Sequence, residues 1–146
     1  MIYKLPVYRV ELVRERSLNA PSRTLRSPID AVRIFRELHG KTDRECLVAI
    51  MLDTKNNVRG VNTVSVGDLS STHAHPREIF KPAILTNAAS IVVLHVHPSG
   101  DPTPSPEDIL VGKRLESAGE ILGIGLLDNI VASDSGFVSL TERGFY

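Results

Sequence analysis

The alternation of apolar and polar side chains divides the chain into strands and helices. Short apolar or alternating runs bounded by turn residues are typical of strands. Such runs occur at residues 8–13, 45–53, 58–66, 88–94, 125–131 and 137–140. Only the turn Thr54-Lys55-Asn56-Asn57 separates the second run from the third, so we expect these two strands to form a hairpin.

Three other segments have the apolar spacing of helices. They span residues 28–40, 76–85 and 105–123. Each has a proline at or next to its start, where the missing N–H costs nothing, and the first and third end at a glycine. For the third helix we expect a buried stripe made of Ile109, Leu110, Leu115, Ala118, Ile121 and Leu122.

Strands and helices therefore alternate along a chain of 146 residues, which is the length of about one domain. We predict an α/β (α+β) fold with three layers around a mixed sheet. Residues 27–146 would form the domain. Residues 1–26 would contribute an N-terminal strand and a connecting segment packed on it.

Composition excludes several classes of protein. The chain is 42% hydrophobic and 23% charged, which is ordinary for a globular domain. The longest strictly apolar runs, residues 46–52 and 91–94, are far shorter than the roughly 20 residues that cross a bilayer. We see no signal peptide, and the single Cys46 fits a reducing compartment, so we expect a cytoplasmic protein without membrane contact.

The net charge is zero but unevenly distributed. Residues 1–44 contain ten basic and five acidic side chains, a net charge of +5, and the remainder carries −5. We interpret the basic third as a solvated helix face and a polar edge strand. Contact with DNA stays open as an alternative, although overall neutrality and the absence of Trp do not favour it.

The candidate chemistry lies around His95-Val96-His97. Two histidines at i and i+2 at the end of a strand point to the same face, so both can bind one cation. Asp108, in the first turn of the next helix, is well placed to be the third ligand. Two imidazoles and one carboxylate leave a fourth position open for water, as a catalytic Zn²⁺ site requires. The same ligands also suit other divalent metals.

A catalytic metal site also needs a general base and a group that stabilises the oxyanion. Glu45 is the candidate base, because an acidic residue directly precedes an apolar strand there. Ser105 is the candidate oxyanion donor. Each of these residues also has a simpler interpretation. Ser105 and Asp108 fit an ordinary helix start, and Glu45 and the two histidines fit polar residues at a sheet edge.

The other histidines and the cysteine have structural interpretations. His73-Ala74-His75-Pro76 repeats the local pattern but follows a polar loop, so we interpret His73 and His75 as loop or cap residues. His39 is expected at a helix C-terminus, where positive charge suits the dipole. Cys46 is expected to pack in the core.

The joint pattern of Glu45, His95-x-His97 and Ser105-x-x-Asp108 resembles the JAMM (MPN+) metalloprotease motif. The wider sequence resembles the bacterial RadC family over roughly residues 27–146. This likeness rests on four segments in order: His75-Pro76-Arg77-Glu78-Ile79-Phe80-Lys81, Asn87-Ala88-Ala89-Ser90, His97-Pro98-Ser99-Gly100-Asp101-Pro102 and Ser139-Leu140-Thr141-Glu142-Arg143-Gly144.

The resemblance implies a JAB/MPN fold with a layout similar to that of cytidine deaminases. It implies one zinc ion held by His95, His97 and Asp108, with Glu45 as acid/base, Ser105 assisting, and hydrolysis of peptide or isopeptide bonds. Our leading hypothesis is thus a zinc hydrolase acting on a protein or peptide. The rival is a DNA-associated accessory module, linked to DNA repair, with a structural or vestigial metal. The physiological substrate and the oligomeric state stay open.

Overall fold

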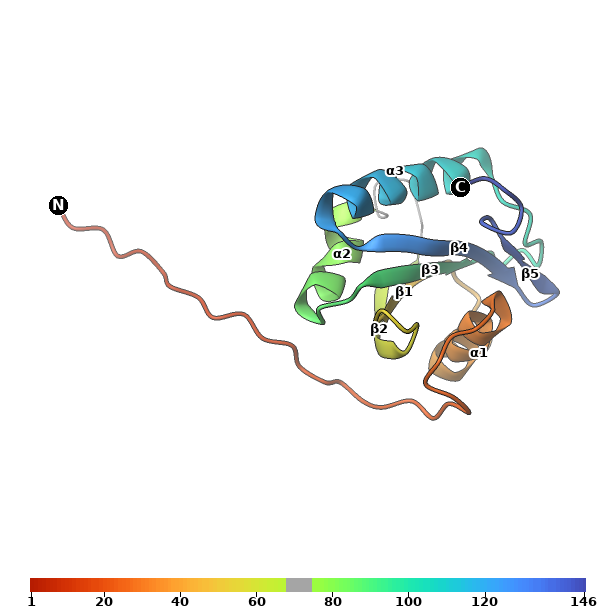
Figure 1. Cartoon of the computed structure of the whole chain (residues 1–146), viewed down its shortest axis with the longest axis horizontal. Helices are drawn as coiled ribbons and strands as arrows, with labels where there is room; N and C mark the ends of the chain where they lie inside the picture. Colours follow the sequence, from red (N-terminus) through yellow and green to blue (C-terminus); the bar gives the residue numbers. More distant parts are fainter. Residues whose placement is uncertain (68–74) are drawn as a thin grey trace.

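The computed structural model describes residues 1–67 and 75–146 and shows a mixed sheet between helices (Figure 1). The helices in these residues are α1 (Pro28–His39), α2 (Pro76–Leu85) and α3 (Pro106–Leu122). The strands are β1 (Cys46–Leu52), β2 (Val58–Val66), β3 (Ser90–Val96), β4 (Gly125–Ser133) and β5 (Gly136–Ser139). The three predicted helices and five of the six predicted strands are thereby confirmed, within a few residues at their ends.

The five strands form one sheet in the order β2-β1-β3-β4-β5. β1 pairs antiparallel with both β2 and β3, whereas β3 and β4 are parallel and are connected through α3. A parallel pair needs such a crossover, and a helix usually supplies it. β3 therefore lies at the centre of the sheet, with a neighbour on each side.

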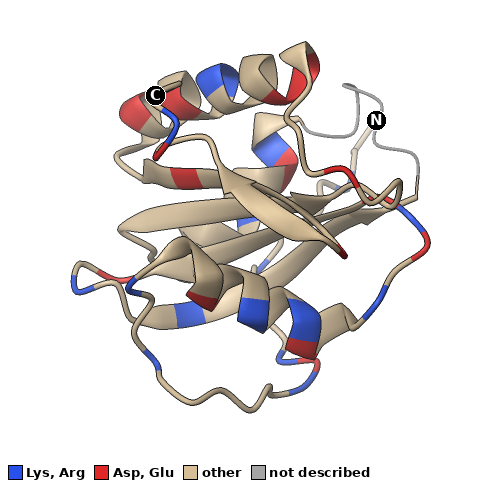
Figure 2. Cartoon of the chain, turned by 90° about the vertical axis from the view of Figure 1, so that its right-hand side faces the viewer, with Lys and Arg blue, Asp and Glu red and all other residues tan. Residues whose placement is uncertain are grey.

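Each face of the sheet has its own apolar core. α1 covers one face, where Val32 and Phe35 pack against alternate residues of β1 and β3 such as Val48 and Leu94. α2 and α3 cover the other face, where Phe80 and Leu115 pack against the intervening residues. Charged residues lie mainly on the helices and loops (Figure 2). The predicted three-layer mixed-sheet fold is confirmed.

The buried stripe of α3 differs from the predicted one. Leu110, Ile121 and Leu122 are exposed, and the buried positions are Gly112, Leu115 and Gly119. The two glycines let the helix approach its neighbours closely, since a Cβ at Gly119 would overlap the carbonyl oxygen of Ile124. A pattern of apolar side chains cannot reveal this stripe, because glycine has no side chain to contribute.

The predicted strand at residues 8–13 is wrong. Residues 1–20 have neither helix nor strand, and residues 1–17 are exposed. Regular pairing of this region with the domain begins at the bridge between Thr24 and Asn57, and Leu25 is the first residue buried in the core. The alternating pattern is present at residues 8–13, but no neighbouring strand in the described chain offers hydrogen bonds to it.

None of the helices in residues 1–67 and 75–146 combines the length and the hydropathy needed to cross a membrane.

We predict that Gly119→Ala destabilises the domain by about 2 kcal/mol, because the new methyl group meets main-chain atoms that cannot move cheaply. The gain of roughly 1 kcal/mol in helix propensity from glycine to alanine is too small to offset this overlap. Urea unfolding measures the effect. Glu120→Ala, at the exposed neighbouring position, is the matched control and should change stability by less than about 0.5 kcal/mol. A wild-type midpoint for Gly119→Ala would contradict the close approach.

Candidate metal centre

The two histidines of the site lie at the end of β3. His95 pairs with Leu47 of β1 and Val131 of β4, so its backbone is held on both sides within the sheet. Its side chain is only 7% exposed and that of His97 is 19% exposed. Side chains alternate along a strand, which places both rings on the α2–α3 face of the sheet, with ring centroids 5.5 Å apart.

Asp108 reaches the histidines from the first turn of α3. Ser105 is the N-cap, and its hydroxyl oxygen accepts a hydrogen bond from the Asp108 N–H at 3.1 Å. The Asp108 Oδ2 accepts one in return from the Ser105 N–H at 2.7 Å. This reciprocal pair is a capping box, which stabilises the helix start and sets the direction of the Asp108 carboxylate.

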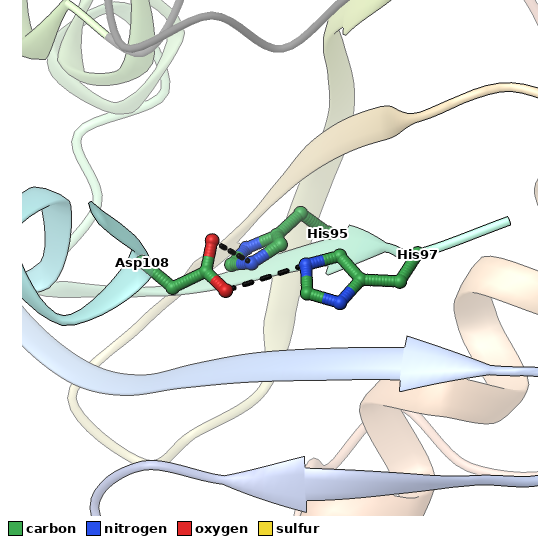
Figure 3. A group of neighbouring side chains, drawn as sticks. All are labelled: His95, His97 and Asp108. Carbon is green, nitrogen blue, oxygen red and sulfur yellow. Dashed lines mark ion pairs between the residues drawn. The ribbon is translucent and has the colours of Figure 1, made fainter. Parts of the chain in front are cut away.

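The three side chains converge from the strand and the helix (Figure 3). Asp108 Oδ1 lies 2.9 Å from His95 Nε2, and Oδ2 lies 3.3 Å from His97 Nε2. One ligand atom from each residue lies within 4.8 Å of the other two. This is the spacing expected of donors that surround one cation, and among the described residues these three form a candidate metal-binding group.

The environment of His95 fits a cation better than it fits a simple ion pair. Its Nε2 is buried and, within the described residues, has no hydrogen-bond partner, although Asp108 Oδ1 is only 2.9 Å away. His95 Nε2 and Asp108 Oδ1 are thus close to each other but are not oriented as in a hydrogen bond. Buried polar atoms are nearly always satisfied, so an unsatisfied ring nitrogen beside a carboxylate supports a site for a metal ion.

The charge of Asp108 is favourable for binding a cation. Burial by itself would raise the pKa of this carboxyl, but the close contact with His95 and the two hydrogen bonds with Ser105 outweigh burial and lower the pKa to about 2. Asp108 is therefore ionised at neutral pH and needs no proton loss before it binds a metal. Opposite charge and hydrogen bonds to the charged form are the usual causes of such a shift.

The outer nitrogen of His97 is also held. Its Nδ1 lies 3.2 Å from the backbone carbonyl oxygen of Asp101, which can only accept a hydrogen bond, so Nδ1 carries the proton. The proton on Nδ1 leaves Nε2 of the neutral ring with its lone pair directed toward Asp108 and the shared centre. A second hydrogen bond of this kind is usual for histidines that bind metals.

The other predicted site residues have these positions. Glu45 lies one residue before β1, is partly buried, and its backbone carbonyl accepts a hydrogen bond from the Gly67 N–H. Cys46 of β1 pairs with Val96 of β3, and the two strands are antiparallel. Glu45 directly precedes Cys46 and His97 directly follows Val96, so both residues lie at the same end of this strand pair. Ser105 lies at the N-cap of α3. The proposed roles of both residues in catalysis stay predictions.

His75, His39 and Cys46 lie at the positions that their structural interpretations predict. His75 is the N-cap of α2 and accepts a hydrogen bond from the Arg77 N–H, whereas His73 lies outside the described residues. His39 is the last residue of α1, as predicted, and contacts Thr63 Oγ1 at 2.8 Å. Burial and the nearby charge of Arg16 lower the pKa of its ring, which disfavours the predicted positive charge. Cys46 is buried, and burial raises the pKa of its thiol.

Two residues that hold the start of α3 were missed by the sequence analysis. Asn129 of β4 is fully buried, and its Nδ2 donates to the backbone carbonyl of Asp108 and to Tyr146 Oη, at 3.3 Å each. Tyr146 Oη in turn donates to the carbonyl of Ile109 at 3.2 Å. The Tyr146 ring lies over Gly112, where a Cβ would overlap it. Asn129 is 21 positions from Asp108 and Tyr146 is 37 positions from Ile109, so no local pattern indicates these contacts.

The fold and the site together define the class of this protein. It is a three-layer domain in which a strand–helix crossover presents a His-His-Asp cluster suited to a divalent cation. The sequence model of the RadC-like JAB domain family matches residues 25–145, and the chain therefore belongs to that family. The resemblance seen in the sequence is thereby confirmed.

Curated relatives include proteins named UPF0758 from bacteria and other organisms. One from Shouchella clausii is 49% identical over 133 residues, which cover 91% of this chain and 57% of the relative. One from Moorella thermoacetica is 48% identical over 135 residues, covering 92% and 59%. One from Methanococcoides burtonii is 43% identical over 125 residues, covering 86% and 55%. The chain thus spans a little over half the length of these relatives.

We predict that the purified chain binds one Zn²⁺ and that His97→Ala weakens binding by at least about 100-fold, because a ligand is removed from an otherwise prearranged set. Competition with a chromogenic chelator measures the affinity. His75→Ala, which removes a histidine that caps α2, is the matched control and should bind as the wild type does. Equal binding by His97→Ala and the wild type would exclude this cluster as the metal site.

We predict that Tyr146→Phe weakens Zn²⁺ binding about fivefold, the value of roughly one hydrogen bond, because the first turn of α3 loses the tyrosine hydroxyl that bonds its carbonyls. Tyr3→Phe removes the same atom from an exposed ring and should have no effect. If the two variants bind the metal equally well, Tyr146 does not position Asp108.

Proposed function

We propose that this protein is a metal-dependent hydrolase of the JAMM type that cleaves a peptide or isopeptide bond in a protein or peptide substrate. The observation that supports this most directly is the convergence of His95, His97 and Asp108. Such a set occupies three positions of a tetrahedral Zn²⁺ site and leaves the fourth for water, which distinguishes catalytic from structural zinc sites. Zn²⁺ is the cation we propose.

The residues of the site would each have a defined part. Bound Zn²⁺ supplies a water ligand acidic enough to act as a nucleophile at neutral pH and polarises the carbonyl to be attacked. The capping box holds the Asp108 carboxylate ionised and directed at the histidines. The Asp101 carbonyl holds His97 in the tautomer whose Nε2 can bind metal.

Glu45 is our proposed general base. The alternation of side chains along β1 assigns Glu45 to the same face as Leu47, and Leu47 pairs with His95. A carboxylate at this position would accept a proton from the attacking water and later donate it to the leaving amine.

Ser105 is our proposed donor to the oxyanion that forms during attack. The capping hydrogen bond uses its hydroxyl oxygen as an acceptor, and a hydroxyl group that accepts can still donate its own hydrogen. The backbone of Ser105 is held by Asp108, so the hydroxyl group would be prepositioned beside the metal ligands. Prepositioned donors of this kind stabilise transition states most.

We predict that Glu45→Gln keeps Zn²⁺ affinity within about twofold but lowers hydrolysis by about 100-fold or more, because the amide cannot accept a proton. The assay uses the zinc-loaded chain with a library of fluorescence-quenched peptides, half of them joined through a lysine side-chain amide. Glu142→Gln, an exposed acid near the C-terminus, is the control.

Two results would contradict the proposal. Glu45→Gln with wild-type cleavage would exclude Glu45 as the base. A zinc-loaded wild type that cleaves no member of the library faster than Glu45→Gln would exclude amide hydrolysis as the activity of this chain.

The DNA-associated accessory module is the rival hypothesis, and the described surface gives it no additional support. α1 carries acidic residues beside its basic ones (Figure 2), and Arg33 forms an ion pair with Asp30 at 3.6 Å. Counterion release requires clustered basic groups that contact phosphates. Binding to duplex DNA that strengthens steeply as salt falls would favour this rival over the hydrolase.

A further inference from the structure

The N-terminal arm, residues 1–15, exposes an unusual amount of apolar surface. Of the sixteen large apolar side chains exposed in residues 1–67 and 75–146, nine lie in residues 1–13. Among these, Tyr8 is 82% exposed and Val10 70%. An extended segment with this composition and free backbone groups is a template for pairing with another strand. The arm therefore has the sequence pattern of a strand, but no other strand of the described chain pairs with it.

The body of the domain holds the base of the arm and leaves the rest projecting from it (Figure 1). The guanidinium group of Arg16 donates to the carbonyl of Leu38 at 2.9 Å, and Thr24 forms an antiparallel bridge with Asn57 next to β2. Continuation of that bridge in register would lay residues 15–23 along β2. In that register residues 8–13 would lie beyond the end of β2, so β2 itself does not pair with them.

The sequence of the arm is complementary to itself in one antiparallel register. When two copies are aligned about Val10, Arg9 of each copy lies opposite Glu11 of the other, which gives two pairs of opposite charge. Tyr8 lies opposite Leu12, so the alternate face of the pair is apolar. A shift of the centre to Arg9 or to Glu11 puts two like charges directly opposite each other, which is destabilising.

We propose that two copies of this chain associate through their N-terminal arms, with residues 7–13 paired antiparallel about Val10. The contact is isologous, because the same segment is used by both copies, and it closes after two chains. A two-stranded ribbon is only marginally stable in water, so the dimer is reversible and its fraction rises with concentration. The association does not depend on the metal centre or on hydrolysis.

A charge reversal tests the register. Arg9→Glu and Glu11→Arg should each weaken the dimer about tenfold or more, since either one places like charges opposite each other twice. The double variant R9E/E11R restores both pairs in reverse and should return the dissociation constant to within about threefold of the wild type. Sedimentation equilibrium over a concentration series measures it, and Arg14→Glu, outside the paired residues, is the control for net charge.

A disulfide cross-link tests the geometry independently. Residues at the two-fold axis of an antiparallel pair have Cα atoms about 4.5–5.5 Å apart, within the range a disulfide spans. Val10→Cys should therefore form a covalent dimer under mild oxidation. Arg14→Cys should not, because the two positions would be about 27 Å apart at roughly 3.4 Å per residue. Native Cys46 is only 1% exposed and does not compete.

Three outcomes would overturn the proposal. They are a wild-type chain that stays monomeric up to about 1 mM, a dimer that persists unchanged in Arg9→Glu, and equal cross-linking by Val10→Cys and Arg14→Cys. All these side chains are exposed, so folding should not change, and thermal unfolding of each variant checks this. A monomer in which the arm is protected from proteolysis would indicate pairing with its own domain and would likewise exclude the dimer.

Discussion

The candidate site depends on one carboxylate that makes two kinds of contact. Asp108 closes the capping box with Ser105, and its two oxygens also approach the ring nitrogens of His95 and His97. The direction of this side chain is consequently set by the backbone of α3 rather than by a free rotamer. The position of this candidate metal ligand therefore depends on the stability of the helix start.

The rest of the fold serves to bring that helix start to the end of β3. β3 is flanked by β1 and β4, so the backbone of His95 is held within the sheet on both sides. Asn129 and Tyr146 hold the opposite side of the α3 turn from a neighbouring strand and from the C-terminal segment. Hydrogen bonds from two separate parts of the chain, β4 and the C-terminal segment, thus hold the backbone carbonyls of Asp108 and Ile109.

The sequence predicted the convergence of His95, His97 and Asp108 because the signals for it are local. The spacing of two histidines on a strand implies a shared face, and the Ser105-x-x-Asp108 pattern implies a helix start. The predictions that failed depend on contacts between residues far apart in the sequence. Residues 8–13 have the alternation of a strand, but a strand also needs a neighbour, which no pattern within the segment can supply.

The dependence on distant contacts also explains why the buried stripe of α3 was predicted wrongly and why the role of Tyr146 was missed. Leu110 and Ile121 have the apolar side chains of a core stripe, yet the helix turns its glycines inward because close approach matters more there than side-chain volume. Tyr146 contacts Gly112 across a long separation in the chain. Only the three-dimensional packing shows why a small residue at one place needs an aromatic ring at another.

All three candidate ligands lie within the short stretch 95–108, on a single strand–loop–helix unit. A bound cation would therefore cross-link the ends of a loop of about a dozen residues. Closing so short a loop costs the chain little conformational entropy. Its stabilising effect would be concentrated on the crossover between β3 and α3 and would reach the β1–β2 hairpin only through the sheet. Binding of a cation would therefore change local rigidity around this crossover more than the stability of the whole domain.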